Sequence, residues 1–244
     1  MNRLRACVRL ARALLHILHG FLVILLVFPR LTQTHREARI QAWSIEMLGC
    51  IAIKLIVKGQ PAAPGPLLVV ANHISWLDIT SMHAARFCRF VSKADIKKWP
   101  MIGTLATGVG TLFIERESRR DAMRVVQHMT ARLKEGDVIG IFPEGTTSDG
   151  RSLLPFHANL FEAAIAAGAP VQPVALDFID HITGQRSFAP CYIDEDTLFG
   201  SLWRTLCTSN IAVVMTFGEP QYAAGRNRRE WAAALKSDIE QLRS

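Results

Sequence analysis

Short apolar runs separated by amphipathic stretches dominate the chain beyond residue 66. Five of these runs have the length of buried strands: 67–71, 111–115, 138–142, 171–176 and 211–217. Apolar residues at helical spacing predict three helices, over 119–134, 159–167 and 231–242. Because strands alternate with helices, the pattern predicts an α/β layered domain.

The first 58 residues carry a different pattern. Residues 13–28 form an apolar run without Asp, Glu, Lys or Arg, and basic residues stand on both sides of it. The run has sixteen residues, which is short for a bilayer crossing of about 20 residues. Residues 43–57 form a second apolar stretch, interrupted by Glu46 and Lys54, which is typical of an amphipathic segment. The proline-rich segment 61–66 then marks a boundary.

Two membrane arrangements fit this pattern, because basic residues on both flanks give no orientation by the positive-inside rule. One is a helical hairpin that dips into one leaflet with both ends cytoplasmic, and the other is a single span followed by a surface helix. A signal peptide is a third interpretation, but no convincing small-x-small cleavage site follows Phe28. We expect a membrane-anchoring helical hairpin over 1–58 and the α/β domain over 59–244.

Composition narrows the partners and the chemistry. The chain has 244 residues and a formal net charge of +7, which favours an anionic partner. Because no basic stretch is interleaved with aromatic residues, we expect a membrane and no nucleic acid. The five cysteines are scattered and include no Cys-x-x-Cys pair, which argues against a disulfide framework and a zinc site.

The first candidate site follows the predicted strand 67–71, where His73 and Asp78 stand five positions apart. The end of a strand in an α/β sheet is where catalytic groups collect. Across a turn, Asp78 can hold one imidazole nitrogen while the other faces a substrate, as a base and its orienter do. Spacing alone is a weak signal, because His157 and Glu162 form a similar pair.

No Gly-x-Ser-x-Gly motif accompanies this pair, and Ser75 shows no sign of activation. We therefore expect the base to activate a hydroxyl of the substrate rather than a nucleophile of the protein.

Two further segments carry polar residues after predicted strands. In the segment 142–150, Pro143 and Gly145 force a turn whose N–H groups can face a ligand, and Glu144 can bind a polar group of a substrate. An ordinary strand-to-loop turn is the alternative. Arg116 ends another predicted strand and can make a fork contact with a phosphate, although a solvated surface arginine is as typical there.

Taken together, these segments resemble the glycerophospholipid acyltransferase family. The family block Asn-His-x-x-x-x-Asp matches 72–78, and Gly-x-x-Phe-[Ile/Val]-[Asp/Glu]-Arg matches 110–116. The block Phe-Pro-Glu-Gly-Thr-Arg-Ser matches 142–148, except that Thr147 stands where the family has arginine. The blocks occur in family order and cover about residues 65–180.

The resemblance implies a mixed sheet flanked by helices and an O-acyltransferase of phospholipid biosynthesis. Such an enzyme moves a fatty acyl group from acyl-CoA or acyl-carrier protein to the hydroxyl of 1-acylglycerol 3-phosphate, giving phosphatidic acid. It implies His73 as general base and Asp78 as its orienter. It assigns substrate binding to four residues: Arg116, Glu144, Gly145 and Thr146.

The N-terminal hairpin also resembles the family's membrane-anchoring two-helix element. We expect the chain on the inner membrane, with the catalytic domain on the cytoplasmic side. We expect no cofactor and no metal ion, since His73 has no second His or Cys at ligand spacing. Thr147 leaves an alternative acceptor open, because a neutral hydroxyl replaces a phosphate-binding charge. That alternative is lyso-ornithine lipid, a substrate of relatives that share the Gly-Thr-Thr loop.

Overall fold

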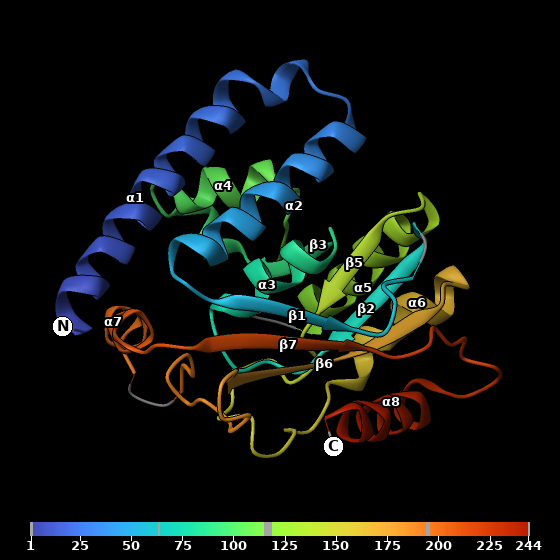
Figure 1. Ribbon diagram of the computed structural model, residues 1–244. Coiled ribbons are helices and arrows are strands. Elements are labelled where there is room, and N and C mark those ends of the chain that lie inside the picture. The colour runs from blue at the N-terminus through green and yellow to red at the C-terminus, as the bar shows by residue number, and fades with distance from the viewer. Residues whose placement is uncertain (1, 63, 115–118, 194–195, 244) are drawn as a thin grey trace.

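The computed structural model describes residues 2–62, 64–114, 119–193 and 196–243. Within these residues, seven strands form one sheet in the order β1-β7-β6-β2-β5-β3-β4 (Figure 1). The strands are β1 Lys54–Lys58, β2 Leu67–Ala71, β3 Arg89–Lys93, β4 Leu112–Ile114, β5 Val138–Ile141, β6 Val171–Asp180 and β7 Ile211–Phe217. Strands β6 and β7 pair antiparallel, whereas the other neighbours pair parallel, so the expected mixed sheet is confirmed.

Helices cover both faces of the sheet. They are α1 Asn2–Leu26, α2 Gln33–Cys50, α3 Leu77–Ala85, α4 Ile102–Gly108, α5 Arg119–Lys134, α6 Glu162–Ala167, α7 Leu198–Cys207 and α8 Arg228–Leu242. All five residues of β2 are buried, and they alternate between two cores. Leu67 and Val69 pack with α2, α3 and α7, while Leu68 and Val70 pack with α5, α6 and α8. The apolar run of β2 is therefore the centre of a three-layer arrangement.

Most predicted elements are confirmed, with small differences at their ends. Helix α5 and strand β7 have the predicted bounds, and β6 continues to Asp180, beyond the predicted end at 176. The predicted helix over 159–167 divides into a 3-10 turn, Ala158–Phe161, followed by α6.

The prediction of one continuous amphipathic segment over 43–57 was wrong. Its first part ends helix α2, and Lys54–Lys58 is strand β1, which pairs with β7. Because β1 is an edge strand, Lys54, Val57 and Lys58 stay exposed, and the strand mimics an amphipathic helix in its hydrophobic pattern. The last five residues of the expected hairpin segment, 54–58, therefore belong to the sheet.

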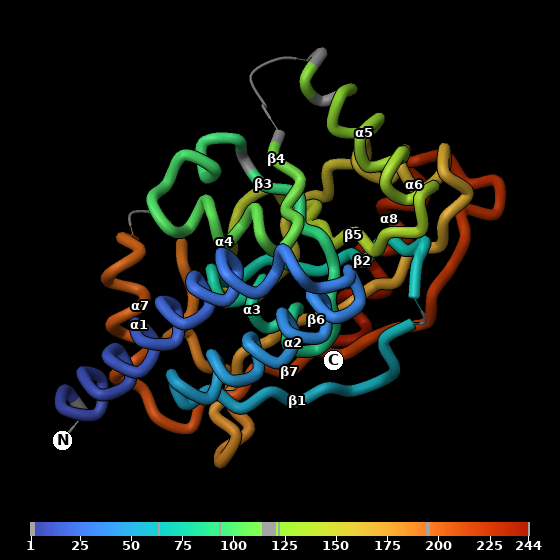
Figure 2. The backbone as a smooth tube through the Cα atoms, turned by 90° about the horizontal axis from the view of Figure 1, so that it is seen from above, coloured from blue at the N-terminus to red at the C-terminus, as the bar shows by residue number. Residues whose placement is uncertain are grey.

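Helices α1 and α2 form a hairpin that lies over one face of the sheet (Figure 2). At their contact the rings of His16 and Trp43 stack with centroids 4.9 Å apart, and each ring bonds the other residue's carbonyl oxygen. A Cβ at Gly20 would lie 2.4 Å from Nε1 of Trp43, so a glycine is required for this approach. Arg9 fastens the N-terminal end of the hairpin by donating to the carbonyl oxygens of Leu206 and Thr208.

Helix α1 exposes a series of large apolar side chains: Leu14, Leu15, Leu18, Leu22, Leu25 and Leu26. By length and composition, Arg3–Leu26 can cross a membrane. The helix is longer than the apolar run in the sequence because it continues through the basic N-terminal residues.

Candidate active site

Asn72 positions the start of the site at the end of β2. Its side chain is fully buried and bonds both backbone groups of Leu176 on β6, at 2.9 Å through Nδ2 and 2.8 Å through Oδ1. The amide therefore imitates one more step of strand pairing between β2 and β6. His73 follows directly, where the strand has ended.

His73 and Asp78 meet as their spacing predicts. Nδ1 of His73 lies 2.7 Å from Oδ2 of Asp78, which is fully buried in the first turn of α3. The same oxygen accepts the backbone N–H groups of Ile74 and Ser75 at 2.7 and 2.9 Å. Because three donors converge on one carboxylate oxygen, the carboxylate cannot rotate freely. A carboxylate oxygen accepts, so Nδ1 carries the proton and Nε2 of a neutral ring is left as an acceptor.

The other side of the His73 ring meets aromatic residues. It stacks on Phe142 with centroids 4.2 Å apart, and Phe142 stacks on Phe90 at 5.2 Å. The side chain of His73 is 20% exposed and faces a cavity of about 170 Å³. The cavity has mostly apolar walls: Ile79, Phe90, Val91, Ser92, Ile141, Phe142, Gly145 and Leu160. The imidazole is therefore oriented on one side and open to a ligand on the other.

Glu144 lies beneath this site rather than in its open part. The residue is 4% exposed, and its two oxygens accept the N–H groups of His73 and Leu154 at 2.8 and 2.9 Å. Burial raises the pKa of Glu144, while the two backbone N–H groups and nearby positive charges act in the opposite direction. In the structure this carboxylate holds the His73 backbone, and a contact with substrate stays a prediction.

The turn after Glu144 brings the third sequence block against the first. Gly145 has φ +75°, and a Cβ there would lie 2.8 Å from Nε2 of His157, so glycine is required. Its N–H closes the turn on the carbonyl of Phe142, while the exposed Thr146 donates its N–H to no group in the described part of the chain. The Thr147 hydroxyl donates to the carbonyl of Tyr192. The turn thus presents the N–H of Thr146, unpaired in the described part of the chain, next to Gly145, which lines the His73 cavity.

Ser75 is not available as a nucleophile. It is fully buried, and its hydroxyl donates to the carbonyl oxygen of Pro190 at 2.6 Å. This agrees with the expectation that the base acts on a hydroxyl of the substrate.

The structure brings four of the predicted residues together: His73, Asp78, Glu144 and Gly145, with Thr146 next to them. Arg116 lies outside the described residues. Phe90 was missed because the sequence RFVSK of β3 has no clear strand alternation. The stacking of Phe142 on His73 was also not predicted. Phe142 is the first residue of the block 142–148, directly before the turn, and this position could have indicated the contact.

Comparisons with known proteins identify the family of the chain. The model of the Acyltransferase family matches residues 54–177. The 1-acyl-sn-glycerol-3-phosphate acyltransferase of Neisseria gonorrhoeae is 41% identical over 75% of this chain and 71% of its own length. The lyso-ornithine lipid O-acyltransferase of Pseudomonas aeruginosa is 36% identical over 98% of this chain and 93% of its own.

A solved structure shows the same fold. The 1-acyl-sn-glycerophosphate (LPA) acyltransferase PlsC from Thermotoga maritima aligns over 97% of this chain and 98% of its own, with a TM-score of 0.64 at 20% identity. The family model covers half of the chain, including the range 72–148 that holds the three sequence blocks, and the relatives cover most of the chain. The chain therefore belongs to the acyltransferase family and is an acyltransferase.

Proposed function

We propose that the protein transfers a fatty acyl group from a thioester donor to the free hydroxyl of 1-acylglycerol 3-phosphate, giving phosphatidic acid. The observation that carries the reaction type is the His73 ring, which Asp78 holds at Nδ1 while its other side faces a cavity. The acceptor is supported by the two Neisseria relatives, each 41% identical over 75% of this chain.

The chemistry needs no covalent intermediate on the protein. Nε2 of His73 takes the proton of the acceptor hydroxyl as its oxygen attacks the thioester carbonyl carbon. The carbonyl electrons move to oxygen, and the free N–H of Thr146 is our candidate donor to this oxyanion. When the tetrahedral intermediate collapses, the carbon–sulfur bond breaks and the imidazolium returns its proton to the thiolate. Asp78 stabilises the imidazolium between these steps.

Glu144 acts in this proposal as a positioning residue, because its two oxygens accept the backbone N–H groups of His73 and of Leu154. Arg116 is assigned to the acceptor phosphate from its place in the second family block. The donor is acyl-CoA or acyl-carrier protein, and the reaction takes no cofactor.

Lyso-ornithine lipid is the second candidate acceptor. The family arginine of the third block is Thr147 here, and its hydroxyl is engaged with the carbonyl of Tyr192. A charged contact to an anionic group is worth about 1.5–3 kcal/mol, so its absence favours a less anionic head group. The Pseudomonas relative, matched over nearly the whole chain, also supports this acceptor.

One assay separates the candidates. Purified membranes receive a labelled acyl thioester, as acyl-CoA or acyl-carrier protein, with each acceptor at equal concentration. We expect faster acylation of 1-acylglycerol 3-phosphate and loss of that activity in Arg116→Ala. A preference for lyso-ornithine lipid with Arg116→Ala nearly silent would replace the proposed acceptor. Thiol release that needs no lysolipid would instead indicate a hydrolase.

The hairpin supports association with the cytoplasmic face of the inner membrane. Helix α1 is apolar and largely exposed, whereas α2 carries Glu37, Arg39 and Glu46 and is too polar to cross a bilayer. A hairpin with one apolar and one charged helix suits insertion into a single leaflet. This arrangement keeps the catalytic domain on the side of the N-terminus.

A further inference from the structure

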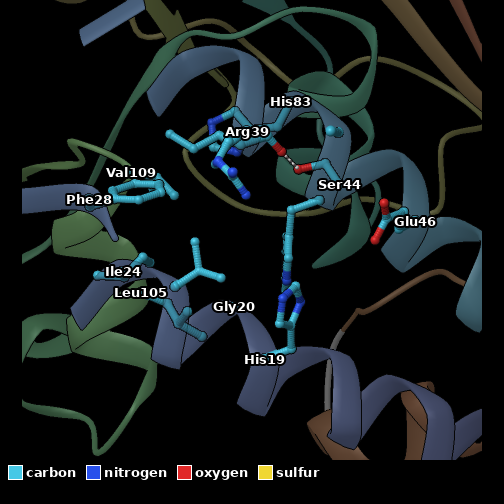
Figure 3. Close-up of a pocket in the computed structure, with 14 residues that line it drawn as sticks. His19, Gly20, Ile24, Phe28, Arg39, Ser44, Glu46, His83, Leu105 and Val109 are labelled. Atoms are coloured by element: carbon cyan, nitrogen blue, oxygen red, sulfur yellow. Dashed lines mark hydrogen bonds between the residues drawn. The ribbon is translucent and has the colours of Figure 1, made fainter. Parts of the chain in front are cut away.

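A second cavity lies between the hairpin and the catalytic domain, away from His73. Its volume is about 140 Å³, and none of its residues lines the His73 cavity. Helices α1 and α2 of the hairpin form its walls, together with α4 and His83 of α3 from the catalytic domain (Figure 3). No step of acyl transfer uses it.

Close contacts build this cavity, so it is not a loose gap between helices. The Trp43 ring against Gly20 joins α1 and α2 on one side. A Cβ at Gly108 would lie 2.7 Å from the side chain of Ile24, so α4 is also closely packed against α1. At the hairpin tip, Nε of Arg36 donates to the carbonyl of Phe28 at 2.9 Å. The surrounding helices are therefore held in place around the cavity.

The walls are suited to hydrocarbon. The apolar wall residues are Val23, Ile24, Phe28, Ile40, Leu105 and Val109. Apolar cavities of about 150 Å³ take ligands of the size of benzene, which corresponds to a segment of an acyl chain. The same part of α1 exposes Leu18, Leu22 and Leu25. On the proposed membrane association, this part of α1 contacts lipid.

The cavity also holds a cation that lacks a protein partner. Arg39 is exposed, forms no ion pair or hydrogen bond with any described residue, and points into the cavity across from Ile24 and Leu105 (Figure 3). His83 beside it is neutral, because burial lowers its pKa to about 4. Glu46, the acidic residue at the cavity, lies 3.8 Å from His16 at the helix contact. The charge of Arg39 is therefore available to an anion outside the protein.

We propose that this cavity binds an anionic membrane phospholipid, with part of one acyl chain among α1, α2 and α4 and its phosphate at Arg39. The inference rests on the proposed membrane association and goes beyond the acyl-transfer reaction. The bound lipid joins the hairpin to the catalytic domain and is not acylated, because no residue of the His73 site reaches it. The site would make the hairpin prefer anionic lipids more strongly than the general positive charge of the protein surface does.

The test uses the purified full-length protein in uncharged detergent. Phosphatidylglycerol or phosphatidylcholine with identical chains is added, and native mass spectrometry counts bound lipid while thermal unfolding gives Tm. The variants are Arg39→Gln, Val109→Phe and Leu105→Phe, the last two of which fill the cavity. The matched control is Arg12→Gln, which removes an exposed arginine of α1 outside the cavity. Inorganic phosphate alone serves as the probe for a plain anion site.

We expect phosphatidylglycerol to bind and to raise Tm more than phosphatidylcholine. Arg39→Gln reduces this preference roughly tenfold, as loss of a charged contact does, whereas Arg12→Gln leaves it unchanged. The filling variants lose binding of both lipids while keeping acyl transfer in detergent, which shows that they fold. Equal effects of Arg39→Gln and Arg12→Gln, or undiminished binding in both filling variants, would overturn the proposal. A Tm increase with inorganic phosphate alone would replace it with a site for free anions.

Acyl transfer is measured on the same samples. If acyl transfer is absent from wild type while the anionic lipid still binds, the proposed function fails and this inference stands. If acyl transfer is normal and the preference for anionic lipid is absent, the proposed function stands and this inference fails.

Discussion

The His73–Asp78 pair is where single residues have the largest expected effect. His73→Ala removes the base that we assign to the acceptor proton, so the rate of acyl transfer should fall at least ~100-fold. The measurement is acyl transfer by membranes that contain equal amounts of each variant. Circular dichroism and membrane fractionation check that the variant stays folded and bound. A variant that kept more than about a tenth of the wild-type rate would contradict the assignment.

Asp78→Asn tests orientation separately from proton transfer. The Asp78 carboxylate accepts from Nδ1 of His73 and from two backbone N–H groups. Because all three donors meet at Oδ2, an amide that places its NH₂ there presents a donor to Nδ1 and favours the wrong tautomer. An amide that keeps its oxygen there still lacks the negative charge that stabilises the imidazolium. We expect kcat to fall severely with little change in the KM for the lysolipid. A loss confined to KM would indicate that Asp78 contacts the acceptor instead.

Glu144→Gln addresses the buried carboxylate. Both oxygens accept backbone N–H groups, from His73 and from Leu154. A glutamine has one oxygen, so its NH₂ would face one of these donors and leave it unsatisfied at a cost of about 1–3 kcal/mol. Urea unfolding in detergent should show this loss, together with a lower kcat, whereas the exposed Glu219→Gln should show neither. Unchanged stability with weaker acceptor binding would support the direct substrate contact instead.

The sequence predicted the local part of this site and not its long-range part. His73 and Asp78 lie in one strand-to-helix turn, so their spacing alone implies the contact. The support from Glu144 and the stacking of Phe142 depend on β5 being the neighbour of β2, which is a property of the whole sheet. The family blocks placed these residues in one site, but only the sheet order explains which atoms meet.

Elements buried on both faces were the ones that the hydrophobic pattern predicted best. Strands β2 and β7 are almost wholly buried and appear as continuous apolar runs. Strand β3 and helix α3 were not predicted, because RFVSK lacks alternation and LDITSMHAA lacks a clear apolar face. The burial of α3 on several sides is set by the hairpin and the sheet around it, which the local sequence does not encode.

Helix α3 also carries a pH dependence. His83 is buried, and its Nε2 lies 2.9 Å from the carbonyl of Cys88, so Nε2 carries the proton of a neutral ring. Burial lowers its pKa from 6.5 to about 4. Between these values the unfolded chain binds the proton and the folded protein does not, so the free energy of unfolding falls as pH falls from 6.5 toward 4.

The loss attributable to His83 should approach about 3 kcal/mol at the lower end of this range. Urea unfolding of wild type and His83→Gln between pH 7 and pH 4 measures it. Glutamine can still donate to the Cys88 carbonyl and does not titrate, so the variant should show a shallower pH slope. Parallel slopes for the two proteins would mean that His83 is already solvated or charged in the folded state.

For the molecule as a whole, the hairpin decides how the catalytic domain would meet the membrane that we propose. Arg9 holds α1 against α7, and the close approach of Gly108 to Ile24 holds α1 against α4, so the hairpin is packed against the catalytic domain at more than one place (Figure 2). Because α1 leaves many leucines exposed, the surface that covers them sets the orientation of the whole protein. A leaflet-inserted hairpin keeps Cys7 and the catalytic domain on one side, whereas a single span through α1 separates them.

Thiol labelling distinguishes these topologies. Cys88 and Cys191 are buried and unsuitable, but Cys7 is exposed near the start of α1. An Ala233→Cys substitution adds a thiol at an exposed position of α8, and Cys50→Ser with Cys207→Ser removes partly exposed thiols. In intact bacterial spheroplasts an impermeant maleimide should label neither Cys7 nor the α8 thiol, and after permeabilisation it should label both.

Two other labelling patterns would each indicate a different topology. Labelling of Cys7 alone would mean that α1 spans the membrane and that the hairpin opens in the bilayer, since the packed hairpin cannot place its two ends on opposite sides. Labelling of both thiols would put the catalytic domain outside, away from intracellular thioester donors. Protection of both is expected because α2 carries charged residues along its length, and burying them in a bilayer costs several kcal/mol. The proposed cytoplasmic topology therefore depends on α2 staying folded against α1, as it is in the structure.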